Sequence, residues 1–161
     1  MVCFDAGVLI DLFNERLSGP RKQRIDLLMA RLGKEKIAIP APAYAEFLTR
    51  SAAARAAYIQ RISSSSAFKV EPFSNRAAIE CAIILEGVFT SKQKKELTKT
   101  KLKFDWMIVA TAKAANATTI YTTDADIVRA CAHAKVDCSH VDDIIIPPET
   151  PDLFNTVRAC N

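Results

Sequence analysis

The sequence predicts an α/β fold, in which helices pack against a mainly parallel central sheet. Short β-favouring apolar runs alternate with segments of helical periodicity from residue 2 to about residue 141, and this alternation is typical of parallel strands joined by helical crossovers. The chain has 161 residues, half of them hydrophobic, which is enough for one domain with a sizeable core. We therefore expect a single domain over residues 1–146 and a proline-containing tail over residues 147–161.

Five strands are predicted, most of them short apolar or β-branched runs that end at a proline or a polar residue. They lie at residues 2–4, 37–39, 68–71, 119–121 and 136–141. Helices are predicted where apolar residues recur at helical spacing, at about 8–13, 20–32, 42–48, 53–63, 74–88, 104–115 and 125–134. The helix over 104–115 is apolar on nearly all sides, which predicts a buried position.

Composition predicts a cytoplasmic protein without a membrane span. The most apolar run, residues 106–112, is far shorter than the ~20 residues that a bilayer requires, and the first residues carry acids instead of the basic cluster of an export signal. The five cysteines are scattered without a Cys-x-x-Cys pair and are expected to be reduced thiols. Two Cys-x-His pairs, at 131/133 and 138/140, match no common zinc spacing, so we expect no zinc site.

Acidic residues follow several of the predicted strands. Asp5 comes after the first strand, and Glu46 lies in the helix after the second. Asp124 and Asp126 follow the fourth strand, while Asp105 stands at the head of the buried helix that leads into it. Because the carboxyl ends of parallel strands share one edge of a sheet, all these acids can reach one crevice.

Each acid taken alone has a structural explanation, since Asp is a favoured helix cap and is stabilised by the helix dipole. For Asp105 by itself, capping is the simpler interpretation. Several carboxylates in one crevice would repel one another and raise their pKa values unless a cation neutralised them. Oxygen ligands without a nearby His or Cys favour Mg²⁺ or Mn²⁺. The pattern therefore predicts a divalent-metal site suited to phosphate chemistry, as in a nuclease.

A basic segment precedes the buried helix. Between residues 91 and 103 the sequence SKQKKELTKTKLK holds six lysines and one acid. Such a run is most often a solvated helix face or loop. The alternative is an arm that contacts the phosphates of RNA, and Lys94, Lys95 and Lys99 are the candidates for it.

Four segments, taken in order, resemble the PIN-domain family and within it the VapC-like toxin ribonucleases of type II toxin–antitoxin pairs: FDAGVLIDLF, AYAEFL, FDWMIVATAKAANA and TIYTTDADI. The resemblance covers nearly the whole chain. It implies a three-layer α/β/α sandwich and hydrolysis of RNA that depends on Mg²⁺ or Mn²⁺. By matching position it implies that Asp5, Glu46, Asp105 and Asp124 are catalytic, that Asp5, Asp105, Asp124 and Asp126 bind metal, and that Thr122 supports Asp124.

The resemblance also implies partners. VapC-like proteins are commonly homodimers that bind a cognate antitoxin. We expect a disordered antitoxin segment to fold onto the first and third helices and to direct an Arg or Lys into the acids. The apolar residues expected to receive it are Leu12, Phe13, Tyr44 and Phe47.

Ala6 and Gly7 depart from the family pattern, which usually places hydroxyl or amide side chains after the first acid. The departure removes groups that could orient a metal-bound water or the substrate. It favours an alternative, a PIN-like module that binds RNA or protein without cutting; a housekeeping RNA-processing nuclease is another. A phosphoacceptor or phosphohydrolase fits less well, because such folds gather paired acids after the first strand. No family position matches the further acids Asp11, Asp142 and Asp143, and we expect them at the surface. His133 and His140 lie outside the motifs, and we expect exposed or core histidines there and not catalytic ones.

Overall fold

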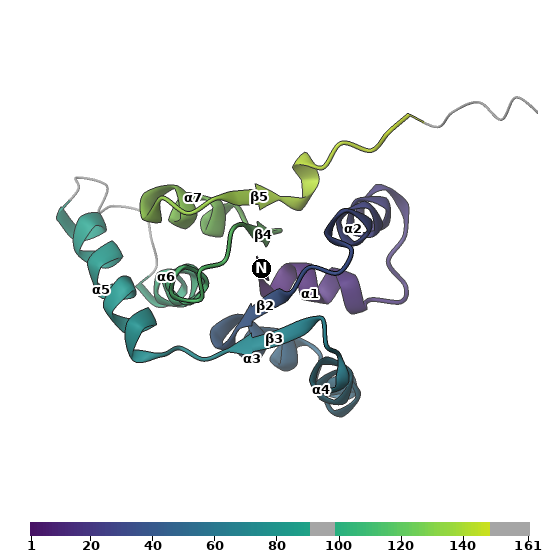
Figure 1. Ribbon diagram of the computed structural model, residues 1–161, viewed down its shortest axis with the longest axis horizontal. Coiled ribbons are helices and arrows are strands. Elements are labelled where there is room, and N and C mark those ends of the chain that lie inside the picture. The colour runs from purple at the N-terminus through teal and green to yellow at the C-terminus, as the bar shows by residue number, and fades with distance from the viewer. Residues whose placement is uncertain (91–98, 149–161) are drawn as a thin grey trace, which may run out of the picture.

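The computed structural model of the protein describes residues 1–90 and 99–148. Over these residues the chain forms five strands and seven α-helices (Figure 1). The strands are β1 (Val2–Phe4), β2 (Ile37–Pro40), β3 (Phe68–Glu71), β4 (Ile120–Thr122) and β5 (Cys138–His140). The helices are α1 (Ala6–Phe13), α2 (Gly19–Leu32), α3 (Ala41–Arg50), α4 (Arg55–Ser64), α5 (Asn75–Thr90), α6 (Lys99–Ala114) and α7 (Ala125–Ala134). Every predicted strand and helix is present, with its ends shifted by a few residues.

All five strands are parallel and stand in the order β3-β2-β1-β4-β5. The chain runs outward from β1 through β2 to β3, then crosses back to β4 on the other side of β1. Strand order therefore reverses between β1 and β4, where a crevice opens at the carboxyl ends of an open parallel sheet. Phe4 pairs with Tyr121 in this register, so Asp5 and Thr122 come next on the two adjacent strands.

Helices cover both faces of the sheet, as the sandwich prediction requires. In Figure 1, α6 and α7 lie on one side, with α5 outside α6, and α1, α2 and α4 lie on the other. The inner strands β1 and β2 are buried along their whole length, which explains why they are continuous apolar runs in the sequence. At the edge strand β3, Lys69 and Val70 are exposed.

Helix α6 is the buried helix of the prediction, but it begins earlier than expected. Trp106 and residues 108–112 are buried against the sheet and the neighbouring helices. The helix starts at Lys99, so Asp105 lies in its second turn and not at its head. Lysine and leucine are good helix formers, which lets the helix extend back through the basic segment. Capping therefore does not explain Asp105.

A cluster of aromatic rings fills the space between α1, α3 and α4. Phe13 and Phe47 are 4% and 0% exposed, and their ring centroids lie 5.5 Å apart. Tyr58 packs against both rings, with centroids 5.2 Å from each. Phe13 and Phe47 therefore belong to the core, and the expectation that these two rings receive an antitoxin segment is wrong. Docking onto α1 and α3 near Leu12 and Tyr44, which are partly exposed, stays a prediction.

Asp11 was expected at the surface but is half-buried between α1 and α2. Its Oδ2 lies 3.0 Å from Nε of Arg21, and Nη1 of Arg21 also lies 2.7 Å from Oδ1 of Asp142. Arg24 contacts the same oxygen of Asp142 at 3.3 Å. These ion pairs tie the short 3-10 helix η2 (Val141–Asp143) to α2, which gives both acids a structural role.

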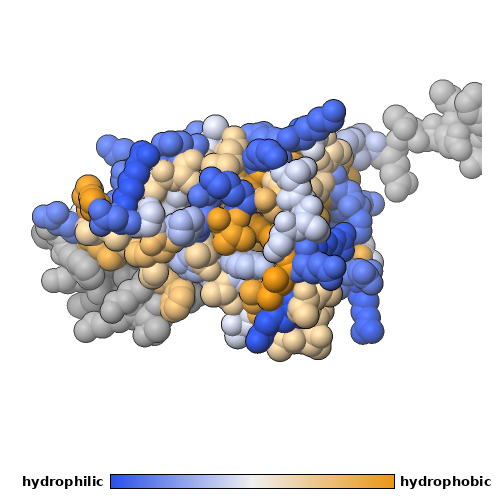
Figure 2. All heavy atoms as spheres, turned by 60° about the horizontal axis from the view of Figure 1, so that its bottom comes forward, coloured by the Kyte–Doolittle hydropathy of each residue, from blue (hydrophilic) through white to orange (hydrophobic). Residues whose placement is uncertain are grey.

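The outer surface mixes residue types. The face drawn in Figure 2 carries small, separate patches of hydrophobic residues among hydrophilic ones, a distribution that is ordinary for protein surfaces. Among the larger exposed apolar side chains are Ile79 and Ile83 of α5 and Phe104 of α6, each more than half exposed. In the described part of the chain, no helix has both the length and the apolar character that a bilayer span needs.

Candidate functional site

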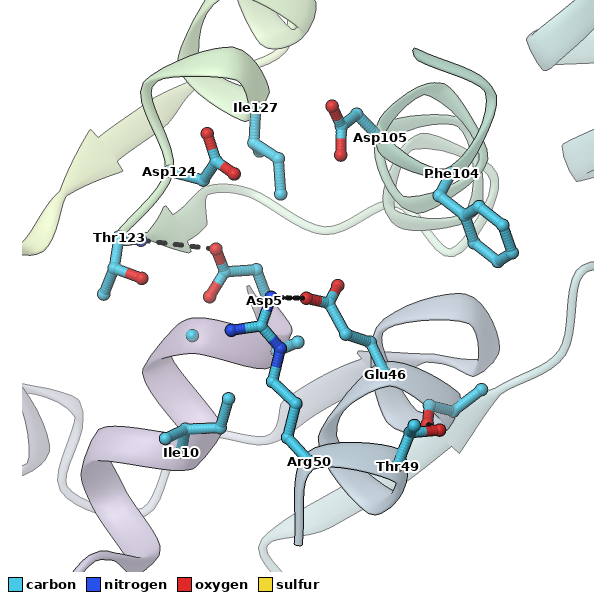
Figure 3. Close-up of a pocket in the computed structure, with 13 residues that line it drawn as sticks. Asp5, Ile10, Glu46, Thr49, Arg50, Phe104, Asp105, Thr123, Asp124 and Ile127 are labelled. Atoms are coloured by element: carbon cyan, nitrogen blue, oxygen red, sulfur yellow. Dashed lines mark hydrogen bonds and ion pairs between the residues drawn. The ribbon is translucent and has the colours of Figure 1, made fainter. Parts of the chain in front are cut away.

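A pocket of about 730 Å³ lies where strand order reverses, at the carboxyl ends of β1 and β4. Residues from the β1–α1 junction, α1, α3, α6, the β4–α7 connection and α7 line it: Asp5, Ala6, Gly7, Ile10, Ala45, Glu46, Thr49, Arg50, Phe104, Asp105, Thr123, Asp124 and Ile127. All four acids that the sequence predicted as catalytic are therefore in one pocket. Figure 3 shows their carboxylates around the same opening, each on a different element.

Asp5 is the most deeply held of these acids and is only 2% exposed. It is the N-cap of α1, because its Oδ1 accepts a hydrogen bond of 2.7 Å from the backbone N–H of Val8. Its Oδ2 accepts from the backbone N–H of Thr123 at 3.2 Å and from the hydroxyl of Thr122. Both carboxylate oxygens are thus fixed by donors of the protein.

Burial raises the pKa of Asp5 from 3.8 to about 6. The hydrogen bonds from Thr122, Val8 and Thr123 act in the opposite direction, and the negative charge of Glu46 adds to the rise. The rise in the pKa of Asp5 that desolvation causes is therefore larger than the fall that the hydrogen-bond donors cause. A cation placed beside Asp5 would relieve the cost of desolvation, which makes this carboxylate a strong candidate ligand.

Thr122 joins the ends of the two central strands. Its side chain is completely buried, and its hydroxyl donates to Asp5, 117 residues away in the chain. The same oxygen accepts a hydrogen bond of 2.9 Å from the backbone N–H of Asp124. Thr122 thus contacts the fourth acid, as the resemblance implied, and also the first. We call Asp5, Thr122, Thr123 and Asp124 the strand wall of the pocket.

The opposite side of the pocket is made of helix side chains. Glu46 of α3 is 42% exposed, and its Oε1 lies 2.8 Å from Nη2 of Arg50, one turn further along the helix. Asp105 and Phe104 face the pocket from α6, and the Phe104 ring is 51% exposed. We call Glu46, Arg50, Phe104 and Asp105 the helix wall.

Asp126 is absent from the lining of the pocket. Its carboxylate pairs with Arg129 on the outer side of α7, and its backbone N–H donates to Oδ1 of Asp124 at 2.8 Å. This hydrogen bond joins its backbone to the Asp124 side chain, which caps α7. Metal ligation by Asp126 stays a prediction.

The histidines and cysteines have other surroundings. The His133 ring packs against Trp106 with centroids 5.9 Å apart, and Nδ1 of His140 accepts from the backbone N–H of Asp142 at 3.1 Å. The four described cysteines are free thiols, as expected. A hydrogen bond with Cys138, together with burial, raises the pKa of Cys131 far above its ordinary value. These contacts give the two Cys-x-His pairs structural roles.

The acids of the pocket suit a hard divalent cation in their chemistry, since every donor is a carboxylate oxygen. Within residues 1–90 and 99–148, no three His, Cys, Asp or Glu side chains stand close enough together to enclose a metal ion as they are placed. On the helix wall, Glu46 is turned to Arg50 instead.

Sequence reasoning missed several residues of the pocket, among them Arg50, Phe104 and Thr123. Arg50 follows Glu46 by four positions, so helical spacing alone could have placed both on one face. No sequence pattern pointed to Thr123, because its contact is with Gly7 of α1, which is far away in the sequence. A Cβ atom at Gly7 would lie 1.9 Å from Oγ1 of Thr123, so this contact requires glycine at position 7.

The basic segment lies largely outside the described residues. This is the case for Lys94 and Lys95, and only the backbone of Lys99 is described, at the start of α6. Contact of these lysines with RNA stays a prediction.

The order of strands, the crevice at their switch point and the acids gathered there define an open parallel α/β protein with a carboxylate-lined pocket. Comparison with family models identifies the family, because the model described as PIN domain matches residues 2–132. The chain belongs to the PIN-domain family. A comparison with curated proteins found no match in sequence.

Several solved structures share the fold. VapBC-1 from nontypeable Haemophilus influenzae is 14% identical, with a TM-score of 0.61 over 88% of this chain and 99% of that chain. VapBC2 from Rickettsia felis, bound to a DNA fragment from its promoter, is 16% identical, with a TM-score of 0.59 over 87% of this chain and 98% of that chain. VapC20 from Mycobacterium tuberculosis, a toxin that cleaves the sarcin–ricin loop, is 18% identical, with a TM-score of 0.56 over 81% of this chain and 95% of that chain.

Proposed function

We propose that the protein is a metal-dependent endoribonuclease and the toxin of a toxin–antitoxin pair. The observation that supports this most strongly is the single pocket that receives Asp5, Glu46, Asp105 and Asp124 from four different elements. Family membership supports a nuclease, and the similar structures, which are toxins or toxin–antitoxin complexes by their descriptions, support the toxin role.

In this proposal Asp5, Asp105 and Asp124 hold Mg²⁺ or Mn²⁺, with Asp126 as an accessory ligand and Glu46 as the fourth catalytic acid. A cation bound there would polarise the phosphate of the substrate and favour formation of a hydroxide nucleophile at neutral pH. The chain's own contribution is to hold the carboxylates: Thr122 fixes Asp5 and the backbone of Asp124. Phe104, half exposed beside the acids, offers a ring on which an RNA base can stack.

The basic segment completes the proposed RNA path. Lys94, Lys95 and Lys99 precede Asp105 in the chain, and in this proposal they contact phosphates of the RNA. Replacing all three by alanine should weaken RNA binding and flatten its salt dependence, because each phosphate contact contributes to counterion release. An unchanged salt dependence of RNA binding in the triple variant would show that the segment is a solvated surface that does not contact RNA.

Cleavage assays test the nuclease part directly. The purified protein is incubated with structured RNAs in Mg²⁺, in Mn²⁺ and in excess chelator. We expect cleavage that chelator abolishes and that Asp105→Asn reduces at least a hundredfold, since the variant keeps size but loses a ligand charge. Asp143→Asn is the matched control, because Asp143 is exposed and absent from the pocket lining. If no RNA yields a metal-dependent product, the non-cleaving module is the better account.

Growth assays test the toxin part. Expression of the wild-type chain should slow growth, Asp105→Asn should be harmless, and co-expression of an adjacent antitoxin gene should restore growth. A chain that is freely tolerated yet cleaves RNA in the tube would be a housekeeping nuclease instead. Light scattering of the purified protein tests the proposed homodimer.

A further inference from the structure

The first turn of α1 and the connection after β4 meet at a contact that leaves no room for a side chain. A Cβ built on Gly7 would lie 1.9 Å from Oγ1 of Thr123 and 3.2 Å from its Cβ. Oδ1 of Asp5 would be 3.5 Å from the same point. The Thr123 hydroxyl therefore occupies the space, next to Asp5, that a side chain at position 7 would take.

This hydroxyl differs from the other hydroxyls near the acids. The Thr49 hydroxyl donates to the carbonyl of Ala45 at 2.8 Å, and the Thr122 hydroxyl donates to Asp5. The Thr123 hydroxyl has no hydrogen-bond partner among the residues that the structure describes. Its backbone is nevertheless fixed, since the N–H of Thr123 donates to Oδ2 of Asp5. The pocket thus contains one well-positioned neutral donor that the protein itself leaves unused.

We propose that the Thr123 hydroxyl binds a phosphate oxygen of the RNA at the Asp5 side of the pocket. The inference rests on the proposed ribonuclease function and names a further substrate-binding group for it. A phosphate that approaches four carboxylates is repelled by them, and a hydroxyl beside Asp5 offers it a hydrogen bond; hydroxyl side chains are common phosphate contacts. Gly7 is the residue that makes this placement of the hydroxyl sterically possible.

Two kinds of substitution should then have the same effect. Thr123→Val removes the hydroxyl and keeps the shape of the side chain. Gly7→Ala adds one methyl group, which forces Oγ1 of Thr123 out of its position although the alanine itself removes no polar group. Because both changes act on one hydrogen bond, their effects on RNA binding should not add in the double variant.

The test measures RNA affinity and cleavage separately. Fluorescence anisotropy with a labelled RNA that the wild-type protein cleaves, in excess chelator, gives Kd; steady-state cleavage in Mg²⁺ or Mn²⁺ gives kcat and KM. We expect Thr123→Val and Gly7→Ala each to raise Kd about tenfold, the scale of one hydrogen bond to a charged group. Thr123→Ser should stay within about twofold of the wild type. Thr118→Val is the control, because its exposed hydroxyl donates to Met1 at the other end of β4.

Packing at position 7 is tested without RNA. Gly7→Ala should lower the melting temperature of the wild-type chain and have a much smaller effect in a Thr123→Ala background, where Oγ1 is gone and the nearest remaining atom, Cβ, is 3.2 Å away. Equal effects in both backgrounds would show that the two side chains do not compete for this space, and would overturn the inference.

The outcomes separate this inference from the proposed function. If the wild type cleaves RNA and Thr123→Val matches it in Kd, the phosphate contact is wrong while the ribonuclease assignment stands. A fall in kcat alone, with Kd unchanged, also overturns the contact. If the wild type neither binds nor cleaves RNA, the ribonuclease assignment fails and the inference fails with it.

Discussion

The strand wall and the helix wall of the pocket are held in place by different forces. On the strand wall, backbone N–H groups of Val8 and Thr123 and the buried hydroxyl of Thr122 fix Asp5 at the ends of two paired strands. On the helix wall, Glu46 is 42% exposed and has a salt bridge to Arg50 on its own helix. The strand wall is therefore part of the fold, whereas the exposed Glu46–Arg50 pair of the helix wall can rearrange at little cost in stability.

This difference has a chemical meaning for the proposed metal site. A preorganised carboxylate loses no side-chain freedom when a cation binds, but Asp5 is costly to keep charged in the free protein, as its raised pKa records. An exposed carboxylate such as Glu46 is easily charged and must be drawn away from its arginine. The strand wall thus holds the carboxylate of Asp5 in a fixed position, and the helix wall provides in Glu46 a charged carboxylate whose orientation can change.

The strongest test of the comparison is Thr122→Val. The variant keeps the shape of the side chain but leaves Oδ2 of Asp5 with one donor fewer and the N–H of Asp124 without its acceptor. We expect the free energy of unfolding to fall by about 2–4 kcal/mol in urea denaturation, because buried polar groups lose their partners. Thr122→Ser, which keeps the hydroxyl, should lose less. Equal losses in the two variants would mean that packing, and not the hydrogen bonds, holds the strand wall.

A smaller effect, of opposite sign, is expected from Asp5→Asn. Burial raises the pKa of Asp5 from 3.8 to about 6, so the charged carboxylate costs the fold about 3 kcal/mol above pH 6 and nothing below pH 4. Asparagine removes this cost but loses about 1–2 kcal/mol, since it has one acceptor oxygen and cannot accept both from Val8 on one side and from Thr122 and Thr123 on the other. Without divalent ions the variant should be about 1–2 kcal/mol more stable than the wild type at pH 8.

The pH dependence of this gain is the informative part. As the pH falls from 8 to 4, Asp5 becomes protonated in the folded wild type and the cost of keeping it charged disappears. The stability advantage of the variant should therefore shrink and then reverse. Thermal melts at pH 4, 6 and 8 measure it, with Asp143→Asn as the exposed-acid control. An advantage that does not change with pH would contradict a raised pKa at Asp5.

The smallest expected effect on stability comes from the helix wall. Arg50→Ala removes an exposed pair at i, i+4 spacing, so unfolding free energy should change by no more than about 0.5 kcal/mol. Glu46 is then no longer neutralised, and Mn²⁺ affinity, measured by electron paramagnetic resonance without RNA, should rise roughly threefold. A large loss of stability, or weaker Mn²⁺ binding, would contradict the division of roles between the two walls.

The main elements of the site could be predicted from local sequence patterns. The strands before Asp5 and Asp124 are short apolar runs, and the helix that carries Asp105 is apolar on nearly all sides. These patterns depend on neighbours within a few residues, so they can be recognised in the sequence alone. Because the carboxyl ends of parallel strands share one edge of a sheet, the patterns were sufficient to place all four pocket acids there. Some expectations from the sequence were wrong: Asp105 is not at a helix head, Phe13 and Phe47 are core rings, and Asp11 is half-buried.

The amino-acid sequence by itself therefore determined which segments become strands and helices, and which carboxylates follow them. Only the tertiary structure decided that β1 lies beside β4, that Thr122 joins Asp5 to Asp124, and that the Thr123 hydroxyl fills the space at Gly7. The physical reason is the distance along the chain. Asp5 and Thr122 are 117 residues apart, so their contact depends on how whole layers pack, and no periodicity or local preference near either residue specifies it.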